Sequence, residues 1–265
     1  MKRFFVLFLI VLLLVGLVPP VLAYTEPEME EMPEFEWTEL HLAYMQGDTY
    51  GNFRPMANIT RAEVSAILAR TFITDFVPGE LPAGMEAFDF FVDVHPDDWF
   101  FYYVAWAYHE GLILGSPPNA IHPYPRFRPG YAMRRDEVVA ALVRVDGAYE
   151  ISEPAPFLDW EQTFPWARPY IYTAYQKGWV FGAGGYFRPL TPITRAEVAT
   201  IVNRILGRVT SMRDLEHVEV ENLGAARNFL DVSVYEWYFA AVLAATSQHE
   251  LRRAPDWTVR WMHFV

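Results

Sequence analysis

Apolar residues recur at intervals of three and four along several short stretches of the chain, which is the spacing of one helix face. Two stretches share this spacing: Val64, Ile67 and Leu68, and later Val198, Ile201, Val202 and Ile205. Two aromatic stretches share it as well: Tyr102, Tyr103, Trp106 and Ala107, and then Ile171, Ala174 and Tyr175. Each aromatic stretch runs into a glycine, Gly111 or Gly178, which is the expected left-handed stop of a helix. The pattern predicts a mainly α fold with little room for sheet.

These stretches belong to an internal repeat. In its second half, Phe-Arg-Pro is followed at a fixed interval by the start of an apolar helix. The interval is the same in all three copies: Pro55 to Thr60, Pro129 to Arg134, and Pro189 to Thr194. The first half also occurs three times, as a phenylalanine and an aspartate ahead of a tryptophan. These residues are Phe91, Asp93 and Trp99, then Phe157, Asp159 and Trp166, then Phe229, Asp231 and Trp237.

The three first halves and the three second halves do not come from the same units. The N-terminal unit lacks its first half, and the C-terminal unit lacks its second half. In a complete unit a glycine ends the first helix. At the spacing of the complete units, this glycine position falls at Ala43 in the N-terminal half-unit and at His249 in the C-terminal one, so the repeat is divided near the same point in both. We therefore infer that residues 229–250 pack beside residues 40–72 and complete a third helix-loop-helix unit. This would close a pseudo-three-fold ring that needs no capping repeats, whereas decay of the repeat at two free ends is the alternative.

The start of each second-half helix carries the candidate chemistry. Two units have the Thr-x-x-Glu pattern of a capping box, which explains both residues structurally: Thr60 with Glu63, and Thr194 with Glu197. In the second unit Arg134 replaces the threonine, so we expect that cap to be lost, although Glu137 is kept.

An arginine follows the cap position in every unit: Arg61, Arg135 and Arg195. A positive charge in the first turn opposes the helix dipole, at a cost of about 0.3 kcal/mol or more, and the sequence offers no structural reason for it. A helix N-terminus with free amides and a guanidinium is a good receptor for a carboxylate or phosphate. The alternative is that these arginines pair with carboxylates of neighbouring units.

The repeated tryptophans and aspartates have more than one interpretation. Trp99, Trp166 and Trp237 are candidates for stacking on sugar rings, but a repeated tryptophan at helical spacing is more often core. We expect core positions with a ring edge lining a groove. The aspartates that precede them in each unit are expected to be caps or turn formers rather than ligands.

Composition narrows the class of protein further. The chain has 265 residues, 52% of them hydrophobic, so it can bury a core. A net charge of −12 argues against non-specific binding to nucleic acid or to anionic lipid, and there is no cysteine for disulfides or thiolate chemistry. Lys2, Arg3, the uncharged run 4–18 and Val21-Leu22-Ala23 are typical of a cleaved signal peptide rather than a membrane anchor.

The repeated residues resemble the S-layer homology family. The resemblance rests on Phe-x-Asp-Val before a tryptophan, the glycine pairs Gly111/Gly115 and Gly178/Gly182, Phe-Arg-Pro, and Ile-Thr-Arg-Ala-Glu, and it covers about residues 37–250. It implies a three-pronged, pseudo-three-fold α-helical domain that attaches non-covalently to acidic, often pyruvylated, secondary cell-wall polysaccharide of Gram-positive-type bacteria. In that family the arginine of Thr-Arg-Ala-Glu contacts the acidic substituent, which maps onto Arg61, Arg135 and Arg195. The second unit departs from the pattern at Met133-Arg-Arg-Asp-Glu137, with a proline-rich insertion at 116–126.

The expectation is a secreted, monomeric cell-wall-anchoring module with no enzymatic activity, cofactor or metal. The candidate glycan-binding residues are Arg61, Arg195, Arg135, Glu63, Glu197, Glu137, Trp99, Trp166 and Trp237. A wall-glycan hydrolase and a protein-interaction scaffold are the alternatives. The expected boundaries are a signal peptide (1–23), an acidic leader (24–36), a half-unit (37–75), two units (88–147 and 155–208), a half-unit (229–250) and a C-terminal tail (251–265) whose role is open.

Overall fold

The computed structural model describes residues 37–121, 123–147, 149, 154–208, 210–215, 228–253 and 259–264. The expected signal peptide (1–23) and acidic leader (24–36) lie outside the described residues.

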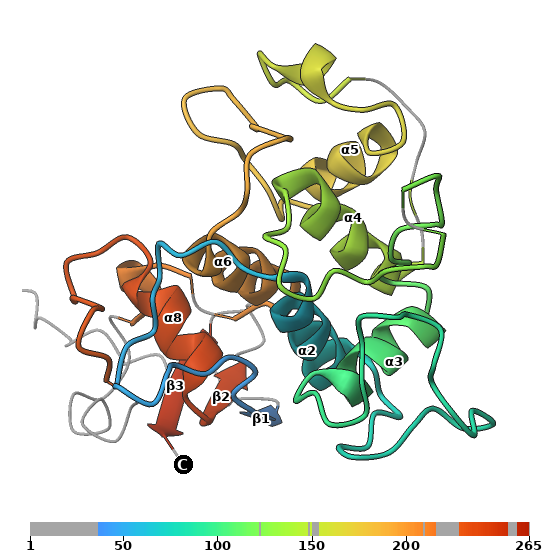
Figure 1. Ribbon diagram of the computed structural model, residues 1–265. Coiled ribbons are helices and arrows are strands. Elements are labelled where there is room, and N and C mark those ends of the chain that lie inside the picture. Colours follow the sequence, from blue (N-terminus) through green and yellow to red (C-terminus); the bar gives the residue numbers. More distant parts are fainter. Residues whose placement is uncertain are drawn as a thin grey trace, which may run out of the picture.

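The described chain is mainly α, as the apolar spacing predicts. Its six α-helices are Arg61–Phe72 (α2), Phe101–His109 (α3), Arg135–Asp146 (α4), Arg168–Gln176 (α5), Arg195–Ile205 (α6) and Phe239–Thr246 (α8). Two 3₁₀ turns, Trp160–Gln162 (η1) and Met212–Leu215 (η2), complete the helical part. Helix α3 packs on α2, α5 on α4, and α8 on α6. In Figure 1, α2, α4 and α6 are innermost, and their partners lie outside them.

A small antiparallel sheet joins the two ends of the described chain, and the sequence pattern gave no sign of it. Its strands are Trp37–His41 (β1), His249–Arg253 (β2) and Val259–Phe264 (β3), in the order β1-β2-β3. His41 is the register partner of His249, and Trp37 that of Arg253. The tail from residue 251 therefore supplies most of β2 and all of β3. Figure 1 shows the three strands beside α8.

The same pair of backbone hydrogen bonds follows each outer helix. Two successive amides donate to one helical carbonyl: Leu112 and Ile113 to Ala107 (2.9 and 3.2 Å), Trp179 and Val180 to Ala174 (2.8 and 3.4 Å), and Tyr44 and Met45 to Ala245 (3.0 and 2.9 Å). In the last pair the donors belong to the N-terminal half-unit and the acceptor to the C-terminal one. The two half-units thus contact each other through the bonds that hold the intact units together.

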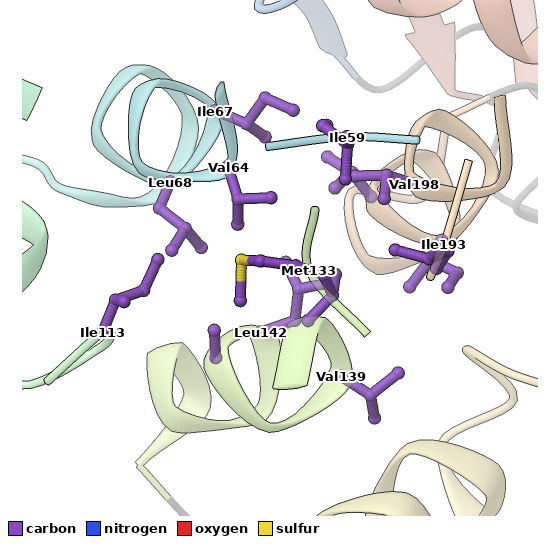
Figure 2. Packing of buried hydrophobic residues seen from close by; sticks show 14 of the residues in the cluster. Ile59, Val64, Ile67, Leu68, Ile113, Met133, Val139, Leu142, Ile193 and Val198 are labelled. Atoms are coloured by element: carbon purple, nitrogen blue, oxygen red, sulfur yellow. The ribbon is translucent and has the colours of Figure 1, made fainter. Parts of the chain in front are cut away.

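Three equivalent residues exchange backbone hydrogen bonds in a closed cycle. The Met133 amide donates to the Ile59 carbonyl (2.9 Å), that of Ile193 to Met133 (3.0 Å), and that of Ile59 to Ile193 (3.0 Å). All three side chains are at most 2% exposed. Figure 2 shows them among the apolar residues of α2, α4 and α6, with Met133 close to Val64 and Leu142. The loops that precede the inner helices are therefore part of the core.

The arginine of each Phe-Arg-Pro adopts a left-handed backbone conformation, with φ of 58° at Arg54, 59° at Arg128 and 60° at Arg188. A non-glycine residue pays about 1–2 kcal/mol for this conformation. The repeated aspartates offset the cost, because each accepts the amides of the phenylalanine and the arginine: Asp93 at 2.8 and 2.9 Å, Asp159 at 2.9 and 2.7 Å, and Asp231 at 2.8 and 2.7 Å. The aspartates were expected to be caps or turn formers. They do stabilise turns, but each of these turns lies 28 or more residues away from its aspartate in the sequence.

Asp231 joins the two half-units, because it belongs to the C-terminal one and its carboxylate accepts the amides of Phe53 and Arg54 in the N-terminal one. Asp231→Ala leaves both amides without their acceptor and is expected to lower the free energy of unfolding by about 1–2 kcal/mol in urea titrations. Asp98→Ala is the control, because Asp98 accepts one amide from within its own turn. Equal losses in the two variants would contradict a joining role for Asp231.

Two histidines meet where β1 pairs with β2. The ring centroids of His41 and His249 are 5.1 Å apart, and His249 is fully buried. Burial, aided by the charges of His41 and Arg208, lowers the pKa of His249 to about 3, although the Ser247 carbonyl beside its Nδ1 opposes the shift. The folded protein therefore keeps His249 neutral over a range in which the unfolded chain protonates it.

The folded pKa of His249 lies below the unfolded value of 6.5, so its contribution to stability is complete above pH 6.5 and is lost as the pH falls toward 3. Below pH 6.5 we expect the free energy of unfolding to fall by up to about 1.4 kcal/mol per pH unit from this group. His249→Phe should flatten the slope measured between pH 5 and 7, and His95→Gln, at an exposed position, should not. An unchanged slope in His249→Phe would refute the assignment.

Candidate functional site

Three grooves of matching composition run beside the inner helices. Each combines the capping glutamate, a first-turn arginine from another unit, a glycine, a last-turn arginine and a tryptophan. Groove 1, of about 190 Å³, contains Glu63, Arg195, Gly47, Arg70 and Trp99. Groove 2, of about 210 Å³, contains Glu137, Arg61, Gly115, Arg144 and Trp166. Groove 3, of about 300 Å³, contains Glu197, Arg135, Gly182, Arg204 and Trp237. All nine predicted site residues therefore line a groove, one of each type in every groove.

The capping boxes of α2 and α6 are confirmed. Thr60 Oγ1 accepts the Glu63 amide at 3.3 Å and Glu63 accepts the Thr60 amide at 2.8 Å, and the same exchange occurs between Thr194 and Glu197. The expected loss of the cap at α4 is only half right. Arg134 has no side-chain acceptor, but its amide still donates to Glu137 at 2.9 Å.

The first-turn amides are not free to bind an anion, contrary to expectation. The Arg61 and Ala62 amides donate to the carbonyls of Tyr131 and Pro129, each at 3.0 Å. The other two helices repeat the arrangement, with Arg135 and Asp136 donating to Thr191 and Pro189, and Arg195 and Ala196 to Ala57 and Pro55. Because backbone carbonyls of another unit occupy these donors, the first-turn amides leave only side chains in the grooves as candidates for contact with an anion.

The first-turn arginines have a structural role that the sequence did not reveal. Arg195 Nε donates to the Phe53 carbonyl at 2.9 Å, and Arg61 Nε to that of Phe127 at 2.7 Å. All three guanidinium groups lie over the phenylalanine of a Phe-Arg-Pro turn, at 4.7 Å for Arg195, 4.9 Å for Arg61 and 5.9 Å for Arg135. The expectation that these arginines lack a structural reason is therefore wrong.

Two of these arginines also pair with a glutamate of another unit. Arg195 Nη1 lies 2.6 Å from Glu63 Oε1, and its Nη2 donates to the Gln46 carbonyl at 2.7 Å. Arg135 pairs with Glu197 in the same way. Burial lowers the pKa of Arg195 from its usual range and Glu63 opposes the shift, but arginine stays charged in proteins. The alternative stated from the sequence, pairing between units, thus occurs in grooves 1 and 3.

The three tryptophans are exposed, so the expectation of core positions is wrong. Trp99 is 59% exposed, Trp166 44% and Trp237 56%. Each lies in the turn one residue before the N-cap of an outer helix, and therefore off the apolar face of that helix. Each lines a groove beside an inner helix of another unit, where an aromatic surface with a polar edge suits a ligand that is partly apolar.

Two further sets of groove residues were not among the predicted site residues. The last-turn arginines lie nine positions after the first-turn arginines, at Arg70, Arg144 and Arg204, a regularity visible in the sequence. Their guanidinium groups are 4.7, 5.0 and 4.8 Å from the rings of Tyr103, Tyr170 and Phe181. The glycines admit no side chain: a Cβ would come within 2.3 Å of Phe229 at Gly47 and within 2.4 Å of Phe91 at Gly115.

In the described part of the chain, no three histidine, aspartate or glutamate side chains are grouped to hold a metal ion. None of its helices is long and apolar enough to cross a bilayer.

The fold and its grooves define an α-helical repeat protein with matching grooves at the boundaries between its units. The family model that matches is the S-layer homology domain, at residues 41–65, 90–139 and 156–199. The chain belongs to the S-layer homology domain family and contains three such segments, which agrees with the resemblance seen in the sequence.

The proteins that the chain is similar to include an anchoring protein, a surface-layer protein and an enzyme. The chain is 26% identical over 230 residues to a cellulosome-anchoring protein of Acetivibrio thermocellus, covering 86% of this chain and 47% of that protein. It is 30% identical over 183 residues to the surface-layer 125 kDa protein of Lysinibacillus sphaericus, covering 66% of this chain and 14% of that one. An amylopullulanase of Thermoanaerobacterium thermosulfurigenes is 29% identical over 171 residues, covering 61% of this chain and 8% of that enzyme. The chain thus spans less than half the length of each of these relatives.

The contacts of the first-turn arginines predict unequal effects on stability. Arg195→Ala removes three polar contacts and leaves Glu63 without its partner, so we expect the free energy of unfolding to fall by about 3 kcal/mol. Arg61→Ala removes one hydrogen bond and a ring contact, and about 1 kcal/mol is expected. Urea titration of both variants measures the difference, and equal losses would contradict this ranking.

Proposed function

We propose that this protein attaches non-covalently to the bacterial cell wall by binding an acidic secondary cell-wall polysaccharide in the three grooves. The observation that carries the proposal is the placement of one first-turn arginine, one exposed tryptophan and one capping glutamate in each groove. A tryptophan face suits a sugar ring, and a guanidinium suits a carboxylate. The proposed location is the cell surface of a Gram-positive-type bacterium, and the names of two relatives support it.

We further propose that the three units form a closed pseudo-three-fold ring within a monomer. The cycle of hydrogen bonds among Ile59, Met133 and Ile193 supports this arrangement, because each segment donates to one neighbour and accepts from the other. Pairing of β1 with β2 supports it at the junction of the two half-units. In this arrangement every groove, including those that depend on a half-unit, has a complete set of residues.

The proposed role of each groove residue follows from its contacts. The tryptophan provides the surface on which a sugar ring stacks, and the first-turn arginine binds an acidic substituent. In grooves 1 and 3 the acid takes the place of Glu63 or Glu197 on the arginine, since these glutamates pair with it in the absence of ligand. The glutamates keep their second carboxylate oxygen on the helix cap, where it accepts the Thr60 or Thr194 amide.

The proposal assigns attachment rather than catalysis to this chain. Each capping glutamate is already engaged in a helix cap, which leaves it unsuited to act as a free acid or base. The amylopullulanase shares only 8% of its length with the chain, so its enzymatic name is not transferred.

The tryptophans provide the cleanest test, because they are exposed and their removal spares the buried ion pairs. A variant with Trp99→Ala, Trp166→Ala and Trp237→Ala is expected to lose sedimentation with purified cell walls, at about tenfold or more in affinity for each groove, as for other aromatic anchors. Tyr124→Ala is the matched control, since Tyr124 is 64% exposed but lines none of the three grooves.

Walls from which acidic substituents have been removed chemically should pellet less of the unaltered protein than intact walls do. Far-UV circular dichroism checks that the triple variant is folded. Undiminished pelleting of the folded triple variant, or equal pelleting with stripped and intact walls, would refute the proposal.

A further inference from the structure

The three grooves differ in the electrostatic state of their first-turn arginine. In groove 1 Arg195 is paired with Glu63 at 2.6 Å, and in groove 3 Arg135 is paired with Glu197. In groove 2 no carboxylate of the described residues forms an ion pair with Arg61. Its guanidinium is held by Nε, which donates to the Phe127 carbonyl at 2.7 Å, and by the Phe127 ring.

The difference arises from a paired substitution at the start of α4. Arg134 stands where the other units have Thr60 and Thr194, and Asp136 stands where they have Ala62 and Ala196. Arg134 Nε and Nη2 donate to the two carboxylate oxygens of Asp136 at 3.0 and 3.1 Å. The Asp136 side chain is fully buried, and the Arg134 guanidinium also lies 5.3 Å from the centre of the Phe164 ring. Arg134 is therefore fixed by two contacts that the other units cannot make.

From this position Arg134 competes for the glutamate of its own unit. Arg134 Nη2 lies 3.9 Å from Glu137 Oε1. The equivalent oxygen of Glu63, Oε1, bonds Arg195, and that of Glu197 bonds Arg135. The cationic neighbour of Glu137 Oε1 is thus Arg134 from its own helix. Burial lowers the pKa of Arg61, and the charges of Glu137 and Asp93 oppose the shift from a distance, but neither carboxylate forms an ion pair with Arg61.

The free-energy cost of binding a ligand carboxylate differs between groove 2 and the other two grooves. In grooves 1 and 3 the ligand must displace a glutamate from an ion pair whose members are 7–26% exposed, and such a pair is not strongly screened by water. In groove 2 the Arg61 guanidinium is already oriented by Phe127, and no ion pair between it and a carboxylate of the described residues has to be broken. A receptor that needs no rearrangement binds more tightly than one that does.

We propose, on the basis of the function proposed above, that groove 2 is the high-affinity site for the acidic group of the glycan, and that Arg134 determines this by holding Glu137 away from Arg61. Arg134 acts through Glu137 and is a positioning residue. The departure of the second unit from the Thr-Arg-Ala-Glu pattern thus strengthens its groove.

The test replaces the start of α4 with that of the other units, by Arg134→Thr together with Asp136→Ala. Both changes are needed, because Asp136 alone would be a buried charge without a partner. A complete capping box should keep the thermal midpoint at or above that of the unaltered protein. Binding of the full chain to intact purified cell walls should nevertheless weaken by about tenfold, because Glu137 is then free to neutralise Arg61.

The reverse exchange in groove 1, Thr60→Arg together with Ala62→Asp, should strengthen wall binding, because it draws Glu63 away from Arg195. A gain of binding cannot arise from loss of the fold, so this variant decides the matter if the first one is unstable. Among single variants, Trp166→Ala should lose more binding than Trp99→Ala or Trp237→Ala.

The outcomes separate the two proposals. Failure of the unaltered protein to pellet with walls overturns the proposed function and this inference with it. Pelleting of the unaltered protein, combined with unchanged binding of the folded Arg134→Thr/Asp136→Ala variant or no gain from the groove 1 exchange, overturns the inference and leaves the proposed function standing. Pelleting that is weakened by the first exchange and strengthened by the second supports both.

Discussion

The structure depends on the exchange of backbone hydrogen bonds among the loops that precede α2, α4 and α6. Ile59, Met133 and Ile193 each donate to one loop and accept from another, and they are buried at the same time. A buried amide or carbonyl without a hydrogen-bond partner is costly. Displacing one loop would leave an amide in one of the other two loops and a carbonyl in the other without a partner. This constraint fixes where the three inner helices begin relative to one another.

The position of the helix starts explains why the grooves are shared between units. Once the first-turn amides are bonded to carbonyls of another unit, the adjacent arginine side chain must extend across the same boundary. Arg195 accordingly reaches the Phe53 carbonyl and Glu63, and Arg61 reaches the Phe127 carbonyl. The same guanidinium group is a structural tie and the proposed anion receptor, so its contribution to stability and its contribution to binding are not independent.

Features that depend on local sequence were predictable, and features that depend on distant contacts were not. The capping boxes at Thr60 and Thr194 and the glycine stops at Gly111 and Gly178 follow from a few adjacent residues, and the structure has all four. The exposure of the tryptophans was missed because helical periodicity carries no information about a residue that lies before the helix. The sheet was missed because β1 and β2 are five residues each and find their partners at opposite ends of the chain. The partners of Arg61 and Arg195 likewise depend on which turn of another unit lies nearby.

The composite grooves also bear on how such a protein can evolve. The unit 88–147 supplies Trp99 to groove 1, Glu137 to groove 2 and Arg135 to groove 3. A mutation in one unit is therefore selected in the context of its neighbours. Divergence such as that at Arg134 and Asp136 in the second unit changes a groove that is also built by Arg61 and Trp166 of other units.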